Sequence, residues 1–217
     1  MRHFTSQDVA TLFPEATDRS YQAGQIVVYE GDKPAFMYFV KKGALKNYDI
    51  DENGVEKILH VVGELGFFSI IYAYGGNTEV DGFYSTLDNT DLLLVPIEDF
   101  RNRLSSDVEF ANKVFEWFVA EMGFIMGRLK GLEKTEGRLK IAQALEYLRG
   151  RHSKLVGKNW WQVKFPISQQ FIADIVGLTR ETVSVILKDF DSKQIISYPK
   201  QMTLQINKKQ LDNLLGS

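Results

Sequence analysis

The sequence predicts an α+β fold in three parts: an N-terminal jelly roll (double-stranded β-helix), one long helix and a C-terminal winged helix-turn-helix. Three observations predict these parts. Short runs of β-branched and aromatic residues alternate with glycines in the first part. One apolar pattern of helical spacing continues through the second, and two short helical segments joined by a glycine precede two short strands in the third. The predicted boundaries are residues 1–105, 106–134 and 135–217.

The composition excludes several kinds of chemistry. The chain of 217 residues contains no cysteine, which excludes disulfides, thiolate zinc sites, cysteine-ligated iron–sulfur clusters and thiol redox switches. His3, His60 and His152 are far apart in sequence, so packed or solvated histidines are the default interpretation, and we expect no metal and no cofactor. No run approaches the roughly 20 apolar residues of a membrane span. We therefore expect a cytoplasmic protein without a membrane partner.

The first part consists of short strands with glycine corners. The pair Asn53-Gly54 stands between two apolar runs and predicts a hairpin with a type I′ turn, because both central positions of that turn need positive φ. Many short strands with such turns are typical of a sandwich or jelly roll. The clearest predicted strands are residues 26–29, 37–40, 44–48 and 57–62.

A long helix is predicted after these strands. Ser106 and Glu109 fit a capping box at its start, in which the hydroxyl and the carboxylate each accept a hydrogen bond from a backbone N–H. Apolar residues then recur at alternating spacings of three and four, which is the heptad pattern of a coiled coil. We interpret this seam as a dimerisation surface, with packing inside one chain as the alternative. The seam comprises Phe115, Phe118, Met122, Ile125, Leu129 and Leu132.

Two further features of this helix have structural consequences. A second apolar set, Phe110, Val114 and Val119, could cover the β-domain. Glycines recur every fourth residue from Gly123 to Gly131, and each costs about 1 kcal/mol relative to alanine inside a helix. This glycine stripe either admits a closely packed neighbour or makes the helix easy to bend, and the sequence leaves both open.

Residues 168–187 have the pattern of a helix-turn-helix. Ser168 and Thr179 stand where the N-caps of two short helices are needed, and Gly177 supplies the turn between them. Ala173 is small where the two helices would cross. A plain αα-hairpin with a glycine turn is the alternative, but the combination of features favours the DNA-binding motif.

A helix at 135–151 and a short strand at 160–165 precede the motif, and two strands at 195–198 and 202–206 follow it as a wing. Exposed residues near the start of the second helix would reach base edges in the major groove. Arginine can donate to guanine O6 and N7, and glutamate can accept from cytosine N4, whereas a solvated surface pair is the alternative. The predicted DNA contacts are Ser168, Gln169, Gln170, Thr179, Arg180, Glu181, Thr182, Ser184, Lys188 and Lys200, the last at the wing tip.

The charge of the chain is divided unevenly. Residues 136–217 contain 13 Lys and Arg against 7 Asp and Glu, a net +6. Residues 1–135 contain 13 against 21, a net −8, so the whole chain has −2. A basic C-terminal part behind an acidic front indicates that only the former binds a polyanion.

At residues 166–198 the sequence resembles the DNA-binding signature of the Crp/Fnr superfamily of transcription regulators, and the likeness extends over about residues 15–210. The resemblance implies a regulator that binds a palindromic operator in double-stranded DNA as a homodimer, with RNA polymerase as a further partner and a β-roll that senses an effector. It also implies a half-site related to TGTGA, with a weaker demand where Val185 replaces a family arginine. The matching run from residue 167 is Ile-Ser-Gln-Gln-Phe-Ile-Ala-Asp-Ile-Val-Gly-Leu-Thr-Arg-Glu-Thr-Val-Ser-Val-Ile-Leu-Lys.

The β-roll departs from the family's cyclic-AMP site. Members that bind cyclic AMP hold the ribose with Gly-Glu and the cyclic phosphate with Arg-Ser. Residues 63–68 resemble the first part, but Val80-Asp81 stand at the position of Arg-Ser, and no Arg or Lys occurs between Lys57 and Arg101. Valine cannot pair with an anion and an aspartate repels it, so we expect no cyclic-AMP binding of the family's kind.

The effector is therefore either an unidentified small molecule, for instance an apolar or aromatic one, or absent. A core role for the aromatic residues is the alternative, as is a structural role for Glu64. The candidate effector pocket comprises Gly63, Glu64, Leu65, Phe67, Phe68, Tyr72, Tyr74 and Asp81.

Three functions compete at this stage. A DNA-binding regulator without a cyclic-nucleotide requirement is favoured, and a cyclic-nucleotide-gated activator is the main alternative. The third is a protein that does not bind DNA and has a cyclic-nucleotide-binding-like domain. No nucleophile–base pair, phosphate loop or metal constellation supports an enzyme. The sequence does not distinguish an activator from a repressor.

Overall fold

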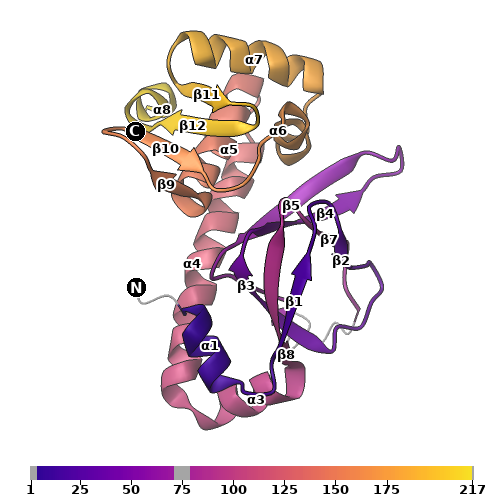
Figure 1. Cartoon of the computed structure of the whole chain (residues 1–217). Helices are drawn as coiled ribbons and strands as arrows, with labels where there is room; N and C mark the ends of the chain where they lie inside the picture. The colour runs from indigo at the N-terminus through magenta and orange to yellow at the C-terminus, as the bar shows by residue number, and fades with distance from the viewer. Residues whose placement is uncertain (1–3, 71–78, 217) are drawn as a thin grey trace. The chain divides into compact units, whose positions relative to one another are not determined.

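The computed structural model describes residues 4–70 and 79–216, which form two compact units. The first unit extends to Met122 and the second begins at Gly123, so the long helix α4 (Val108–Leu132) contributes to both (Figure 1). The boundary between the two units thus falls inside this helix, whereas the sequence pattern predicts the helix as a separate part. In the described ranges, no helix is both long and apolar enough to cross a membrane.

Two four-stranded antiparallel sheets lie in the first unit and confirm the predicted β-rich N-terminal fold (Figure 1). The strand orders are β1-β8-β3-β6 and β2-β7-β4-β5, so strands far apart in sequence lie side by side. Such interleaving of two sheets is typical of a jelly roll. The strands are β1 (Thr17–Tyr21), β2 (Ile26–Val28), β3 (Phe36–Lys42), β4 (Ala44–Ile50), β5 (Glu56–Gly63), β6 (Phe67–Phe68), β7 (Phe83–Thr86) and β8 (Thr90–Pro96).

Alternating residues of the strands serve two separate cores. In β3, Tyr38 and Val40 belong to one buried cluster, which also contains residues of β4, β5, β7 and β8. Met37 and Phe39 belong to the other, which includes residues of the helices α1 (Ser6–Leu12), α3 (Ile97–Ser106) and α4. Because successive side chains of a strand point to opposite faces, one strand can contribute to both clusters.

The hairpin between β4 and β5 is confirmed, but its predicted turn type is wrong. Gly54 has φ +77°, whereas Asn53 is not among the residues with positive φ, so the turn is not type I′. Asp51 closes the turn instead: its Oδ1 accepts from the backbone N–H of Asn53 and of Val55, each at 3.0 Å. The hydrogen bond from Val55 contributes most to lowering the pKa of Asp51.

The predicted N-cap of the long helix is also wrong. Ser106 is the last residue of α3, and its hydroxyl donates to the carbonyl of Asn102 at 2.8 Å. Asp107 is the residue that caps α4, since its Oδ1 accepts from the backbone N–H of Phe110 at 3.0 Å. Aspartate and serine are about equally good N-caps, so local preference did not identify the correct one of two neighbours.

The second unit combines helices with a third four-stranded sheet, of order β11-β12-β10-β9. The strands β11 and β12 form the predicted wing, but β11 continues through Lys200, which pairs with Thr203, so the tip is Gln201-Met202. The elements are α5 (Gly137–His152), β9 (Ser153–Leu155), β10 (Trp160–Val163), α6 (Gln169–Val176), α7 (Arg180–Ser192), β11 (Ile196–Lys200), β12 (Thr203–Asn207) and α8 (Lys208–Leu215).

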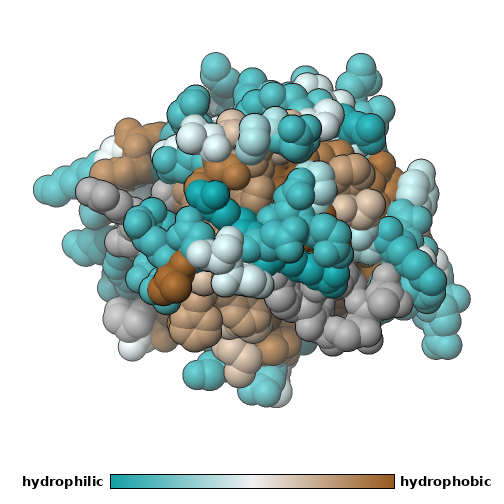
Figure 2. Space-filling model, turned by 90° about the horizontal axis from the view of Figure 1, so that it is seen from below, coloured by the Kyte–Doolittle hydropathy of each residue, from teal (hydrophilic) through white to brown (hydrophobic). Residues whose placement is uncertain are grey.

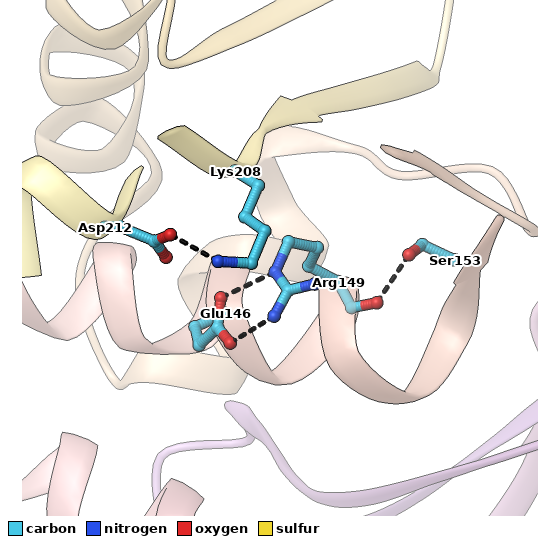
Figure 3. A network of polar contacts seen from close by, with 5 residues as sticks. All are labelled: Glu146, Arg149, Ser153, Lys208 and Asp212. Atoms are coloured by element: carbon cyan, nitrogen blue, oxygen red, sulfur yellow. Dashed lines mark hydrogen bonds and ion pairs between the residues drawn. The ribbon is translucent and has the colours of Figure 1, made fainter. Parts of the chain in front are cut away.

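Local polar contacts lie at the end of α5 and along α8 (Figure 3). Arg149 donates to both carboxylate oxygens of Glu146, at 2.7 and 2.5 Å, and this pairing raises the pKa of Arg149. The hydroxyl of Ser153, the first residue of β9, donates to the carbonyl of Arg149. On α8, Lys208 pairs with Asp212. None of these contacts involves a residue of α6 or α7.

Candidate nucleic-acid interface

The helix-turn-helix forms from local signals that the structure reproduces. The hydroxyl of Ser168 accepts from the N–H of Phe171 at 2.9 Å and begins α6. The hydroxyl of Thr179 accepts from the N–H of Thr182 at 3.3 Å and begins α7. Gly177, between the helices, has φ +67°, a left-handed backbone conformation that residues other than glycine rarely adopt. Both predicted N-caps and the predicted turn are therefore present.

Small and apolar residues fix the angle between the two helices. Ala173 of α6 and Val183 of α7 are fully buried, together with Ile172 and Val176. Leu178 and Ile186, which the sequence also assigns to this core, are only half-buried. Their methyl groups lie 3.2 and 3.4 Å from where a Cβ of Gly137 would stand, so they cover the start of α5.

The outer face of α7 is polar and exposed. Arg180, Glu181, Thr182 and Lys188 are exposed, and Ser184 is half-buried. Within the second unit, α7 runs along the outer edge (Figure 1). The first turn thus presents an arginine and a glutamate to the outside, next to a helix N-terminus that favours anions such as phosphate.

The remaining predicted contacts have varied surroundings. Thr179 and Thr182 share a hydrogen bond between their hydroxyls at 2.9 Å, so these side chains also serve the cap. Gln170 is exposed and donates to Asp174 at 2.7 Å, while Gln169 is half-buried. Lys200 is exposed on the wing. DNA contact by these residues stays a prediction.

An ion pair anchors the rear of α7 to α5. Arg138 donates to Asp189 at 2.7 Å, and Lys193 approaches the same carboxylate to 2.8 Å. The hydrogen bond from Lys193, aided by the charge of Arg138, lowers the pKa of Asp189. An acidic side chain of α7 is thereby paired with cations of its own unit, and repels a polyanion less than a lone carboxylate would.

Arg128 is a positioning residue that the sequence analysis missed. It lies in the distal half of α4 and donates through Nη2 to the carbonyl of Ile175 at 3.0 Å. This carbonyl belongs to the last turn of α6, where backbone oxygens lack partners inside the helix and a cation is favourable. Burial lowers the pKa of Arg128. The contact links the long helix directly to the first helix of the motif.

The predicted dimer seam has a varied environment within one chain. Phe118 packs against the core of the first unit, whereas Phe115 is 66% exposed. Met122, Ile125 and Leu132 are half-buried, and Leu129 is exposed. A view from below shows hydrophobic residues at the surface among hydrophilic ones (Figure 2).

The prediction that the second apolar set of α4 covers the β-domain is correct for two of its three residues. Phe110 and Val114 are buried in the core of the first unit, as expected, and Trp117 joins them. Val119 does not cover the β-domain, because its side chain is 52% exposed. With Met126, which is 54% exposed, it continues the outward series that begins at Phe115.

The predicted effector pocket is dispersed over several environments. Phe67 lies in the core beneath the helices, whereas Phe68 lies in the other cluster, stacked between Tyr38 and Tyr84 at centroid distances of 4.5 and 4.7 Å. Gly63 is buried, Glu64 and Asp81 are exposed, and Leu65 is half-buried with φ +65°. Tyr72 and Tyr74 lie outside the described residues. The pocket stays a prediction.

Val80 stands at the position where the resemblance predicts the family's phosphate-binding arginine. It is 3% exposed and belongs to the same cluster as Tyr38 and Phe68. Its backbone is held on both sides, since its N–H donates to the carbonyl of Asp32 and its carbonyl accepts from Gly31, each at 2.8 Å. The side chain is therefore part of the packing and does not present a cation.

The two described histidines each contact a side chain of their own unit. His152 is buried, and its Nε2 lies 3.3 Å from the hydroxyl of Tyr147. His60 of β5 lies 3.2 Å from a carboxylate oxygen of the buried Glu121 on α4. The latter contact ties the β4–β5 hairpin to the helix within the first unit, a link that spacing in the sequence does not reveal.

Two family models match the chain. Residues 18–107 match the cyclic nucleotide-binding domain, and residues 139–214 match the Crp-like helix-turn-helix domain. The cAMP-activated global transcriptional regulator CRP of Salmonella typhimurium is 22% identical over 82% of this chain and 83% of its own. The global nitrogen regulator of Nostoc sp. is 25% identical over 87% and 84%.

Solved structures share the fold at low sequence identity. FixK2 from Bradyrhizobium japonicum has a TM-score of 0.77 and 22% identity, covering 92% of this chain and 96% of its own. A CooA variant from Carboxydothermus hydrogenoformans has a TM-score of 0.76 and 20% identity, covering 98% and 97%. These likenesses support the order of β-roll, long helix and winged domain along the chain.

Proposed function

The chain belongs to the Crp/Fnr family of DNA-binding transcription regulators, and on this premise we propose that it acts as a homodimer on a palindromic operator, without cyclic AMP or an iron–sulfur cluster. Members of this family are transcription regulators and not enzymes. We propose RNA polymerase as a further partner, as the family resemblance implies.

One observation carries the proposal. The capped pair α6 and α7 presents Arg180 and Glu181 outward at the first turn of α7, while the ion pairs of Asp189 fix the rear of the same helix. Base readout needs side chains that are exposed at one face and a helix that is rigidly held at the other. Arg180, Glu181 and Ser184 are the residues we assign to base edges, and Lys200 we assign to phosphate.

Selection from random double-stranded DNA tests this function. We expect the full-length protein to enrich a two-fold symmetric sequence whose half-site centres are about one helical turn, roughly 34 Å, apart. The half-site should be related to TGTGA. Enrichment of no sequence, or of one without two-fold symmetry, would contradict the proposal. Mapping of bound sites in the genome would then identify the regulated genes.

Independence from cyclic AMP has support in the β-roll. Val80 is committed to the inter-sheet core, the neighbouring Asp81 is an exposed acid, and the sequence has no Arg or Lys between Lys57 and Arg101. A cyclic phosphate would find no cation in this segment, and a buried anion without one is strongly disfavoured. The absence of cysteine from the whole sequence argues against a cysteine-ligated cluster in the same way.

A cyclic-nucleotide-gated activator is the second candidate, because residues 18–107 match the cyclic nucleotide-binding domain model. Calorimetry separates the two functions. Titration with cyclic AMP and with cyclic GMP should give no saturable heat at physiological concentrations, and neither nucleotide should change the affinity for the operator. Titration with the operator itself is the control for active protein. Saturable micromolar binding of either nucleotide would favour the gated activator.

A further inference from the structure

The outer face of α7 contains an apolar residue among polar ones. Val185 is 68% exposed, whereas the other exposed residues of α7 include Arg180, Glu181, Thr182 and Lys188. Within α7, which is described in full, it is the only large hydrophobic side chain that is exposed. The face that we assign to the major groove therefore includes one group that cannot make a hydrogen bond.

Helical spacing places Val185 in the middle of this face. Glu181 precedes it by four residues and Lys188 follows it by three, so both are its neighbours on the helix surface. The buried residues Val183, Leu187 and Phe190 define the opposite side of α7. Val185 thus points away from the core of its own unit, in line with a residue assigned to base contact.

The folded chain gains little from a valine at this position. A β-branched side chain loses rotamer freedom in a helix and has a lower helix propensity than alanine, lysine or arginine. Burial usually compensates for this loss, but Val185 is mostly exposed in the chain. A partner outside the chain would provide the missing apolar contact.

We propose that Val185 reads a thymine in each half-site, through contact of its methyl groups with the C5-methyl group of the base. This methyl is the apolar feature that the major groove offers, and small apolar side chains contact it in DNA-binding proteins. The contacted base lies beside the one that Glu181 reads, because the two side chains are one turn apart. Val185 then makes the protein prefer thymine at that position of the half-site. Without such a contact, the loss of the family arginine would only weaken the preference for one base there. The inference rests on the proposed function, with α7 as the recognition helix.

Deoxyuridine provides the sharpest test, because it differs from thymidine only by the missing methyl. Each thymine of the selected operator is replaced in turn by deoxyuridine, in both half-sites together, and the affinity is measured by fluorescence anisotropy. At one position the wild-type protein should lose about fourfold for each methyl, or about fifteenfold for the symmetric pair, from lost apolar contact. The other thymines should have little effect.

The Val185→Ala variant completes the test as a double-mutant cycle. It should bind the thymine operator more weakly than the wild type, yet be nearly insensitive to deoxyuridine at the sensitive position. Alanine favours the helix, and circular dichroism should confirm an unchanged fold. A Val185→Thr variant, which keeps one of the two methyl groups, should retain part of the sensitivity.

Three results would overturn the inference: wild-type insensitivity at every thymine, equal sensitivity of wild type and Val185→Ala, or a selected half-site without thymine. In each of these cases sequence-specific binding is intact, so the proposed function stands. If selection yields no operator, the proposed function itself fails, and the reading of thymine fails with it.

Discussion

Met126→Glu should convert the proposed homodimer into a monomer. The outward series of α4 comprises Phe115, Val119, Met126 and Leu129, and all four side chains are exposed in the single chain. Successive members are four, seven and three residues apart. A stripe of this period on a continuous helix matches the seam of a two-stranded coiled coil. We therefore propose it as the pairing surface of the homodimer.

The expected effect is large because of the two-fold symmetry. A glutamate at position 126 would bring two like charges together in an apolar seam, and burying an unpaired charge costs several kcal/mol. Since about 1.4 kcal/mol corresponds to a factor of ten, the dissociation constant should rise by at least about a hundredfold. Affinity for the palindrome should fall as well, while the winged domain of each monomer stays folded.

Size-exclusion chromatography with light scattering measures the outcome. Met126→Leu, which keeps the position apolar, is the matched control and should stay dimeric. Ile125→Glu is the variant that the sequence pattern alone would choose, and it should also split the dimer, but Ile125 is half-buried within the chain and the substitution should in addition lower stability. A monomeric wild type, or a dimeric Met126→Glu protein, would show that this stripe is not the pairing surface.

Arg180→Ala should cause the largest loss of sequence-specific binding. Removing an arginine that contacts guanine through two hydrogen bonds should cost roughly 1–3 kcal/mol on the cognate operator and relax the preference at one base pair per half-site. Arg180 is exposed in the first turn of α7, and the cap that begins this helix is made by Thr179. The fold should therefore be unaffected, and competition with operators carrying single base changes would reveal the altered preference.

Lys200→Ala is the matched control for charge. The lysine is exposed on the wing, where it is expected to contact phosphate, so its loss should weaken all sequences to a similar degree and reduce the salt dependence by about one phosphate contact. The two variants thus separate base reading from electrostatic attraction. Equal losses of Arg180→Ala on operator and random DNA would mean that this arginine reads no base.

The sequence by itself determined the features that depend on near neighbours along the chain. The caps of α6 and α7 join each hydroxyl to a backbone N–H three residues later, and the turn depends on the left-handed φ of Gly177. Geometry of this kind depends on residues within a few positions of one another, so it can be predicted from the sequence. The helix-turn-helix, the hairpin between β4 and β5 and the long helix were therefore predictable.

Only the tertiary structure decided which face of an element meets which partner. Phe118 packs inward and Val119 outward, a distinction that the apolar pattern of α4 could not make. At Gly131 an added Cβ would lie 2.7 Å from Cβ of Gln143, so this glycine admits α5, whereas Gly123 and Gly127 face open space. Such contacts join residues distant along the chain.

The same limit explains the links that sequence analysis missed. The bond from Arg128 to the carbonyl of Ile175 spans 47 positions, and the interleaved sheet orders bring β1 beside β8. The residue at either end of such a contact could pair with many others in the chain. Hydrophobic burial and hydrogen bonding do not depend on how far apart two residues are in the sequence. The packed chain selects one partner among them, as it does when Arg128 meets the carbonyl of Ile175 in α6.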